Sequence, residues 1–84
     1  MRRAIKVLMD LPPSDASYRY TVDALHHAIV HLDAAVDVTV EPTDSISGIE
    51  DGVVIGPGSP YRDPIAAEAV IEISRREGIP LVGT

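Results

Sequence analysis

Short groups of hydrophobic residues recur along the chain, and their spacing indicates strands. Residues 53–55 are a Val-Val-Ile run without alternation, as expected of a parallel strand buried on both faces. Residues 4–9 and 79–82 are similarly short and apolar. Residues 36–40 read Val-Asp-Val-Thr-Val, a period of two that predicts a strand with one face in solvent, as at a sheet edge.

A longer group before residue 36 has the spacing of an amphipathic helix. Its apolar residues recur at intervals of three and four, which places them on one stripe, and Thr21 stands where a capping residue is expected. We therefore predict a helix from residue 20 or 21 to about residue 32. The stripe consists of Val22, Leu25, Ile29 and Leu32.

A second helix is marked by both of its ends. Asp63 supplies a capping carboxylate, Pro64 suits the first helical position, and Gly78 is a typical C-terminal stop. We expect its inward face to consist of Ile65, Ala66, Ala69, Val70 and Ile73.

The order strand, helix, strand, strand, helix, strand predicts the fold class. Short links between such elements favour parallel strands joined by right-handed crossovers. We expect an α/β, flavodoxin-like, three-layer arrangement in which about four parallel strands have the order 2-1-3-4. The two helices then cover opposite faces, and residues 1–84 form a single small domain.

Composition narrows the function. Thirteen acidic and seven basic residues give a net charge of −6, which argues against nucleic acid or an anionic membrane as a partner. The chain has no cysteine, which excludes disulfides, thiolate metal sites and a cysteine nucleophile within it. No stretch is long and apolar enough to span a bilayer, so we expect a cytoplasmic protein.

Three polar residues invite a functional interpretation that their context does not support. Asp10 ends the first strand, where a metal ligand or phosphate acceptor is one option, but a turn residue or a helix cap is the commoner role. His27 and His31 lie four residues apart, and no further ligand completes a metal site at recognisable spacing. We expect no metal and no cofactor.

The candidate chemistry lies in the Gly-Pro-Gly-Ser-Pro loop that follows strand 53–55. Ligands of open α/β sheets bind at the carboxyl ends of strands. Glycine permits close approach to the main chain and proline has no N–H, so the N–H groups of Gly58 and Ser59 stand out as donors. Such a loop suits a carbonyl oxygen or an anion.

Three segments together resemble the first half of a class I glutamine amidotransferase domain. They are residues 24–28 (ALHHA), 51–62 (DGVVIGPGSPYR) and 78–84 (GIPLVGT), and the similarity extends over nearly the whole chain. Within that superfamily the chain is most similar to the amidotransferase half of CTP synthase and to the CTP synthase C-terminal-region-related (seleno)proteins. The resemblance implies glutamine amide hydrolysis and ammonia transfer in a full-length parent.

The resemblance also implies roles for individual residues. Pro57, Gly58 and Ser59 match the Pro-Gly-Gly turn that supplies the oxyanion hole, with serine in place of the second glycine. Gly83 and Thr84 match the first two positions of the Gly-x-Cys-x-Gly nucleophile elbow. The family's nucleophile, histidine and glutamate would all follow Thr84, so these 84 residues by themselves are expected to be inactive.

Two explanations fit an end in the middle of the elbow. The chain is either a shortened piece, or its nucleophile is selenocysteine and the UGA codon was read as a stop. We favour selenocysteine as the hypothesis, because the middle of the elbow is an odd place for a chosen boundary.

Two other functions remain open at this stage. A small nucleotide- or phosphate-binding flavodoxin-like module is one, although the loop lacks the third glycine of the dinucleotide fingerprint and no P-loop is present. A receiver-like domain is the other, although the third strand ends in Gly-Pro-Gly where an acceptor aspartate would be needed.

The predicted sheet also suggests a partner. One helix on each face leaves a four-stranded sheet partly uncovered, with the fourth strand as an edge. Uncovered aliphatic surface favours association. We expect a homodimer or higher oligomer, formed through sheet edges or uncovered faces.

Overall fold

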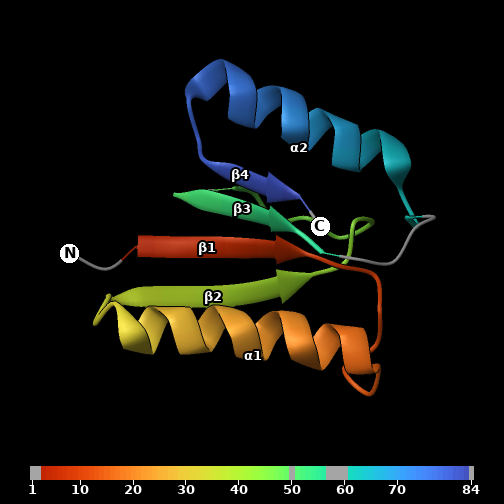
Figure 1. Ribbon diagram of the computed structural model, residues 1–84. Helices are drawn as coiled ribbons and strands as arrows, with labels where there is room; N and C mark the ends of the chain where they lie inside the picture. Colours follow the sequence, from red (N-terminus) through yellow and green to blue (C-terminus); the bar gives the residue numbers. More distant parts are fainter. Residues whose placement is uncertain (1–2, 50, 57–60, 84) are drawn as a thin grey trace.

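Four parallel strands form one sheet with a helix on each face (Figure 1). The computed structural model describes residues 3–49, 51–56 and 61–83. The elements in chain order are β1 (Arg3–Leu8), α1 (Ala16–His31), β2 (Val36–Glu41), β3 (Gly52–Ile55), α2 (Pro64–Glu77) and β4 (Leu81–Gly83).

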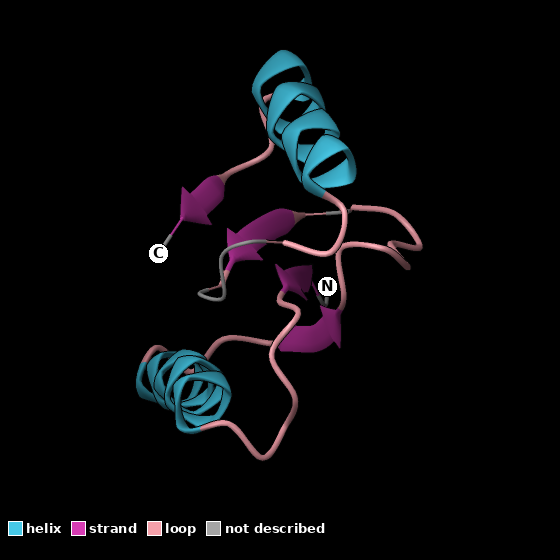
Figure 2. Cartoon of the chain, turned by 90° about the vertical axis from the view of Figure 1, so that its right-hand side faces the viewer, coloured by secondary structure: helices cyan, strands magenta, loops and turns pink. Residues whose placement is uncertain are grey.

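The sheet has the order β2-β1-β3-β4, which confirms the predicted flavodoxin-like topology. Seen end-on in Figure 2, the two helices lie on opposite sides of the sheet. β2 lies at one edge of the sheet. Its first five residues alternate between half-buried and exposed, which confirms the prediction from the Val-Asp-Val-Thr-Val pattern. The crossover through α1 leads from β1 to β2, and the crossover through α2 leads from β3 to β4, which lies in the opposite direction across the sheet. Right-handed crossovers that run in opposite directions across a sheet place their helices on opposite faces.

The best-packed part of the core lies between α2 and the sheet. Leu8, Val53, Ile55 and Val70 form a buried cluster there. The connection after β2 extends this layer, since Ile46 and Ile49 pack against the same cluster. Burial of aliphatic side chains at this density contributes about 1.5–3 kcal/mol each, so this layer holds the domain together.

The other face is more open. No residue of α1 is buried, and its stripe residues Val22, Leu25 and Ile29 are only half-buried. An apolar groove of about 530 Å³ runs between α1 and the sheet, and residues Leu25, Val54 and Val82 are part of its lining. The expectation of uncovered sheet surface is therefore met on the α1 face.

The start of α1 differs from the prediction. The helix begins at Ala16, and its cap is Asp15, whose carboxylate accepts a hydrogen bond from the Ser17 N–H at 2.8 Å. Thr21 lies inside the helix and donates its hydroxyl to the Ser17 carbonyl. The prediction followed the apolar stripe, but the first turn contains no stripe residue and is exposed except for half-buried Tyr18, so the stripe begins after the helix does.

The inward faces of both helices also differ from the prediction. Leu32 caps the C-terminus of α1 and is 73% exposed, because the helix ends before the stripe reaches it. On α2, Ile65 is 78% exposed and Ala69 is exposed, whereas Ala67, Val70 and Ser74 are buried. The buried set lies at i, i+3 and i+7, so the true inward face is rotated toward the smaller side chains.

The predicted ends of α2 are confirmed. The Asp63 carboxylate accepts from the Ala66 N–H at 3.0 Å, and Pro64 occupies the first helical turn. Gly78 adopts a left-handed conformation with φ 69° and donates to the Ser74 carbonyl, a conformation that side chains with a Cβ rarely adopt.

Candidate functional site

The carboxyl ends of β3 and β4 lie side by side, as a shared site at this edge requires. The two strands pair in parallel, and Ile55 is the register partner of Gly83. Ile55 is also the partner of Leu8 in β1, so β3 is flanked on both sides where it ends. The loop after β3 and the chain after β4 therefore leave the sheet from neighbouring positions.

Most of the predicted site residues are not among those described. Pro57, Gly58, Ser59 and Thr84 lie outside the described ranges. Gly83 is described: it is the last residue of β4 and is exposed, and a Cβ added there would have no atom within 4 Å. Gly83 therefore lies exposed beside the end of β3.

Gly56 is the last described residue before the predicted oxyanion loop, and it is fixed to the sheet. Its N–H donates to the Leu8 carbonyl at 2.9 Å, and the residue is buried. An added Cβ would lie 2.8 Å from Met9 Sδ and 3.2 Å from Met9 Cβ. Glycine is needed here because Met9, the residue after β1, approaches so closely.

Replacing Gly56 by alanine is expected to destabilise the domain by about 1–3 kcal/mol, because buried Met9 would have to move. Gly83→Ala is the matched control, since its Cβ meets nothing, and we expect a change below about 0.5 kcal/mol. Urea unfolding measures both. Equal destabilisation of the two variants would contradict the close packing at Gly56.

Asp10 joins three connections at the same edge. Its carboxylate accepts hydrogen bonds from the Thr43 N–H, the Thr43 hydroxyl and the Arg62 N–H, each at 2.8 Å. The Thr43 hydroxyl oxygen in turn accepts from the Asp63 N–H at 3.0 Å. One carboxylate therefore ties the end of β1 to the connection after β2 and to the entry of α2.

This network is buried at Thr43, half-buried at Asp10 and exposed at Arg62, and its carboxylate remains charged. Thr43 is 1% exposed. Burial raises the pKa of Asp10, but hydrogen bonds from the backbones of Arg62 and Thr43 and from the Thr43 hydroxyl outweigh it, so the pKa lies below its ordinary value. Asp10 is an acceptor whose lone pairs are used internally, which favours the structural role expected from its position.

A second polar cluster holds the connection after β2. Lys6 is buried in β1, and its Nζ lies 2.9 Å from Glu41 Oε1 and 2.8 Å from Ser47 Oγ. Ser47 also donates its N–H and its hydroxyl to the Glu41 carboxylate, at 2.9 and 2.7 Å. Hydrogen bonds from the Ser47 backbone and then from the side chains of Lys6 and Ser47 lower the pKa of Glu41 to about 2.

Acid is expected to destabilise the domain through these two carboxylates. The folded pKa of Glu41 is about 2 and its ordinary value is 4.5, so the stabilisation is complete above pH 4.5 and is lost as the pH falls toward 2. The pKa of Asp10 is also lowered in the folded state, so its protonation in acid destabilises the domain as well. Thermal unfolding between these pH values should show a falling midpoint, and Glu41→Gln should flatten the fall. An unchanged pH dependence in Glu41→Gln would contradict the assignment.

A shallow cavity of about 330 Å³ lies beside Asp10. The side chain of Arg62 is 58% exposed, and its Nη1 is 4.0 Å from Asp44 Oδ1, so its guanidinium is only loosely paired. Arg62 therefore gives the cavity a cationic group suited to a carboxylate. The lining consists of Met9, Asp10, Leu11, Pro12, Pro13, Tyr18, Val40, Pro42 and Arg62.

Sequence reasoning missed Thr43, Lys6 and Ser47 altogether. Thr43 and Ser47 lie in a polar connection in which no periodicity separates buried from exposed residues, and Lys6 interrupts an otherwise apolar strand. The nearest signal in the sequence was Lys6, because a lysine in a buried strand requires a carboxylate partner.

His27 and His31 are exposed on α1. Over the described ranges, no group of three histidine, cysteine, aspartate or glutamate residues is placed to hold a metal ion. Neither helix in these ranges is long and apolar enough to cross a membrane.

The chain matches no protein-family model, no curated protein sequence and no solved structure.

Proposed function

We propose that residues 1–84 are the amino-terminal half of a class I glutamine amidotransferase-like domain related to the amidotransferase half of CTP synthase. The observation that carries the proposal is the register pairing of Ile55 with Gly83. It supports a common site for the loop after β3 and the segment after β4. In the proposed domain, these two segments supply the oxyanion donors and the nucleophile.

The proposed chemistry assigns binding to this chain. The N–H groups of Gly58 and Ser59 receive the amide oxygen of glutamine, which becomes an oxyanion when a nucleophile attacks the carbonyl carbon. Anchored Gly56 fixes the start of that loop, and the Asp10 carboxylate holds the backbone at Arg62 just beyond it. The chain has no cysteine, so hydrolysis requires a nucleophile supplied after Thr84.

Glutamine binding in the absence of hydrolysis tests the proposal. We expect L-glutamine to bind the 84-residue chain with a Kd on the order of 1 mM or weaker. In ¹⁵N-labelled protein, the shifted amides should be Gly56, Gly58, Ser59 and Gly83. Ser59→Pro removes one donor and should weaken binding, whereas Pro57→Ala removes none and should retain it.

The titration also separates the alternative function. Inorganic phosphate and AMP are titrated in parallel with L-glutamine, because a nucleotide- or phosphate-binding module would respond to them at the same loop. Shifts caused by phosphate or AMP and not by glutamine would overturn the amidotransferase proposal. So would glutamine shifts confined to residues away from the carboxyl edge.

A further inference from the structure

The shallow cavity beside Asp10 opens where the connections of the sheet diverge. β1 and β3 are neighbours, yet the chain leaves β1 toward α1 on one face, and α2 begins on the opposite face (Figure 1). In open parallel sheets, such a divergence at the carboxyl edge leaves a crevice in which ligands bind. The cavity of about 330 Å³ lies at this edge, because its lining comes from the segment after β1, the end of β2, the first turn of α1 and the entry to α2.

The walls of the cavity are mainly apolar. Six of the nine lining residues are methionine, leucine, valine or proline. Half-buried Tyr18 adds an aromatic ring. The ring of proline is rigid and loses no side-chain freedom when a ligand covers it. A flat apolar group can lie against such walls, and the volume is at the lower end of the range for small-molecule sites, about 300–1,000 Å³, so the ligand must be small.

Two charged groups line the cavity, and they differ in how far the protein already satisfies them. The Asp10 carboxylate accepts three internal hydrogen bonds and stays negative. One of these bonds holds the Arg62 backbone, whereas the Arg62 side chain is 58% exposed and its Nη1 lies 4.0 Å from Asp44 Oδ1. The Arg62 guanidinium is therefore attached to a fixed backbone and retains donors for a planar anion.

The charges around Arg62 favour a monoanion. Asp10 and Asp44 both lie near its guanidinium, and the chain has a net charge of −6. A dianionic phosphate group is repelled by these carboxylates about twice as strongly as a single negative charge. A carboxylate carries one charge, and its two oxygens match two parallel N–H donors of a guanidinium.

We propose that this cavity binds a small monocarboxylate that carries an aromatic ring. The guanidinium of Arg62 receives the carboxylate, and the ring lies against Tyr18 and the proline-rich wall. The site does not rest on the amidotransferase assignment. A single charged contact and a shallow wall give weak binding, with a Kd on the order of 1 mM.

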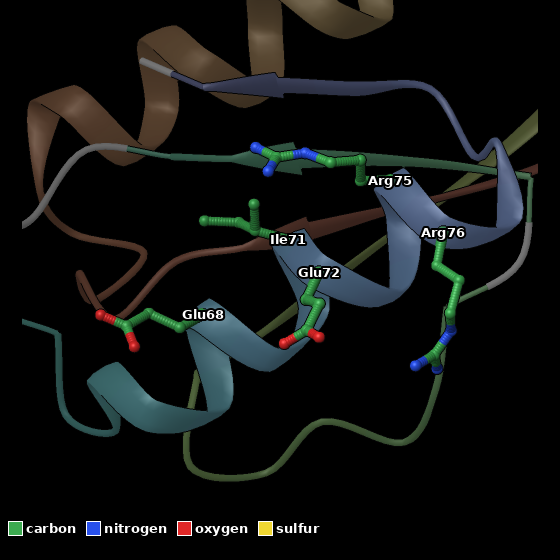
Figure 3. A pocket seen from close by; sticks show the side chains of 5 residues that line it. All are labelled: Glu68, Ile71, Glu72, Arg75 and Arg76. Carbon is green, nitrogen blue, oxygen red and sulfur yellow. The ribbon is translucent and has the colours of Figure 1, made fainter.

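The concavity on the outward face of α2 provides the contrast. Its volume is larger, about 520 Å³, but Figure 3 shows that charged side chains from successive turns of one helix make up most of its lining. Ile71 is the one apolar residue among them. Arg75 on this face is exposed and has the same guanidinium chemistry as Arg62, without apolar walls, and is therefore a matched control. The lining consists of Glu68, Ile71, Glu72, Arg75 and Arg76.

Phenylacetate is the probe, because it joins one carboxylate to a small ring. In protein labelled at amide nitrogens and methyl carbons, it should shift the amides of Leu11, Tyr18 and Arg62 and the methyl groups of Met9 and Val40. Acetate lacks the ring and 2-phenylethanol lacks the charge, so each should bind at least about tenfold more weakly than phenylacetate. Phenyl phosphate, a dianion with the same ring, should also bind more weakly.

Substitution of Arg62 tests the charged contact. Arg62→Gln removes the cation and keeps the backbone N–H that donates to Asp10, so the fold should be retained, as circular dichroism can verify. We expect it to weaken phenylacetate binding at least about tenfold and to leave 2-phenylethanol binding unchanged. Arg62→Lys keeps the charge without the planar pair of donors and should have a smaller effect. Arg75→Gln changes the net charge equally and should bind phenylacetate like wild type.

Three results would overturn the proposal. The first is the absence of any shift with phenylacetate at roughly 10 mM, or shifts confined to residues away from the cavity. The second is equal weakening by Arg62→Gln and Arg75→Gln, which would mean that net charge and not a local contact attracts the anion. The third is tighter binding of phenyl phosphate than of phenylacetate, which would exclude a monocarboxylate as the preferred ligand.

Discussion

Replacing Asp10 by alanine is expected to destabilise the domain by about 3–5 kcal/mol. The substitution removes the acceptor for three hydrogen bonds, from the Thr43 N–H, the Thr43 hydroxyl and the Arg62 N–H. Thr43 is buried, so its donors would lack water as a substitute partner. Unsatisfied buried donors cost about 1–3 kcal/mol each, and bonds to a charged acceptor are at the upper end.

The size of this effect is large for a small domain. A chain of 84 residues is typically stable by about 4–12 kcal/mol, so Asp10→Ala should lower the melting temperature by at least about 12 °C. Asp10→Asn keeps one oxygen acceptor and should lose less. Asp23→Ala, an exposed aspartate on α1, is the control and should change little. Similar melting temperatures for Asp10→Ala and Asp23→Ala would contradict the role of the network.

Replacing Glu41 by alanine is expected to cost about 3 kcal/mol. Lys6 is 9% exposed, and its ammonium group would keep only Ser47 Oγ as a partner. Breaking a buried ion pair by removing one partner typically costs 3–5 kcal/mol, because the remaining charge is uncompensated. Urea unfolding of the single variant measures this cost.

The double variant distinguishes a pair from two independent residues. Lys6→Met/Glu41→Leu removes both charges, and we expect it to be more stable than Glu41→Ala alone. Asp44→Ala is the exposed control, since the Arg62–Asp44 pair spans 4.0 Å and both side chains are in solvent, and it should cost less than about 0.5 kcal/mol. A double variant less stable than Glu41→Ala would show that the buried charge is not the source of the cost.

The fold followed from features that act locally. Alternation in residues 36–40 predicted the edge strand, the Val-Val-Ile run predicted a central strand, and Asp63 and Gly78 predicted both ends of α2. These patterns depend on backbone preferences and on the period of each element. With crossovers of fixed handedness, they predicted a parallel sheet, and the order 2-1-3-4 followed from the likeness to flavodoxin-like folds.

The remaining features depend on contacts between distant residues. The burial of Thr43 depends on Asp10 and Asp63, which lie far from it in sequence. α1 begins at a polar turn capped by Asp15, so its apolar stripe could not reveal its start. Ser74 is buried on α2 while Ile65 is exposed, because the sheet contacts a narrow strip of the helix near Val70.

The candidate site could likewise be predicted only in part. The sequence predicts its position at the carboxyl edge, because strand ends could be counted, and the pairing of Ile55 with Gly83 shows that the two strands end side by side. It did not predict the anchors on either side of the loop, since the Gly56 bond to Leu8 and the Asp10 bond to Arg62 join separate elements.

The coding sequence beyond Thr84 tests the central proposal most directly, together with the intact mass of the protein made from it. The account predicts a cysteine codon or an in-frame UGA immediately after Thr84, then a glycine two codons later and a distant His-x-Glu. An in-frame UGA would specifically support the selenocysteine hypothesis. A codon for any other amino acid at that position, or a UAA or UAG stop, would contradict the amidotransferase assignment.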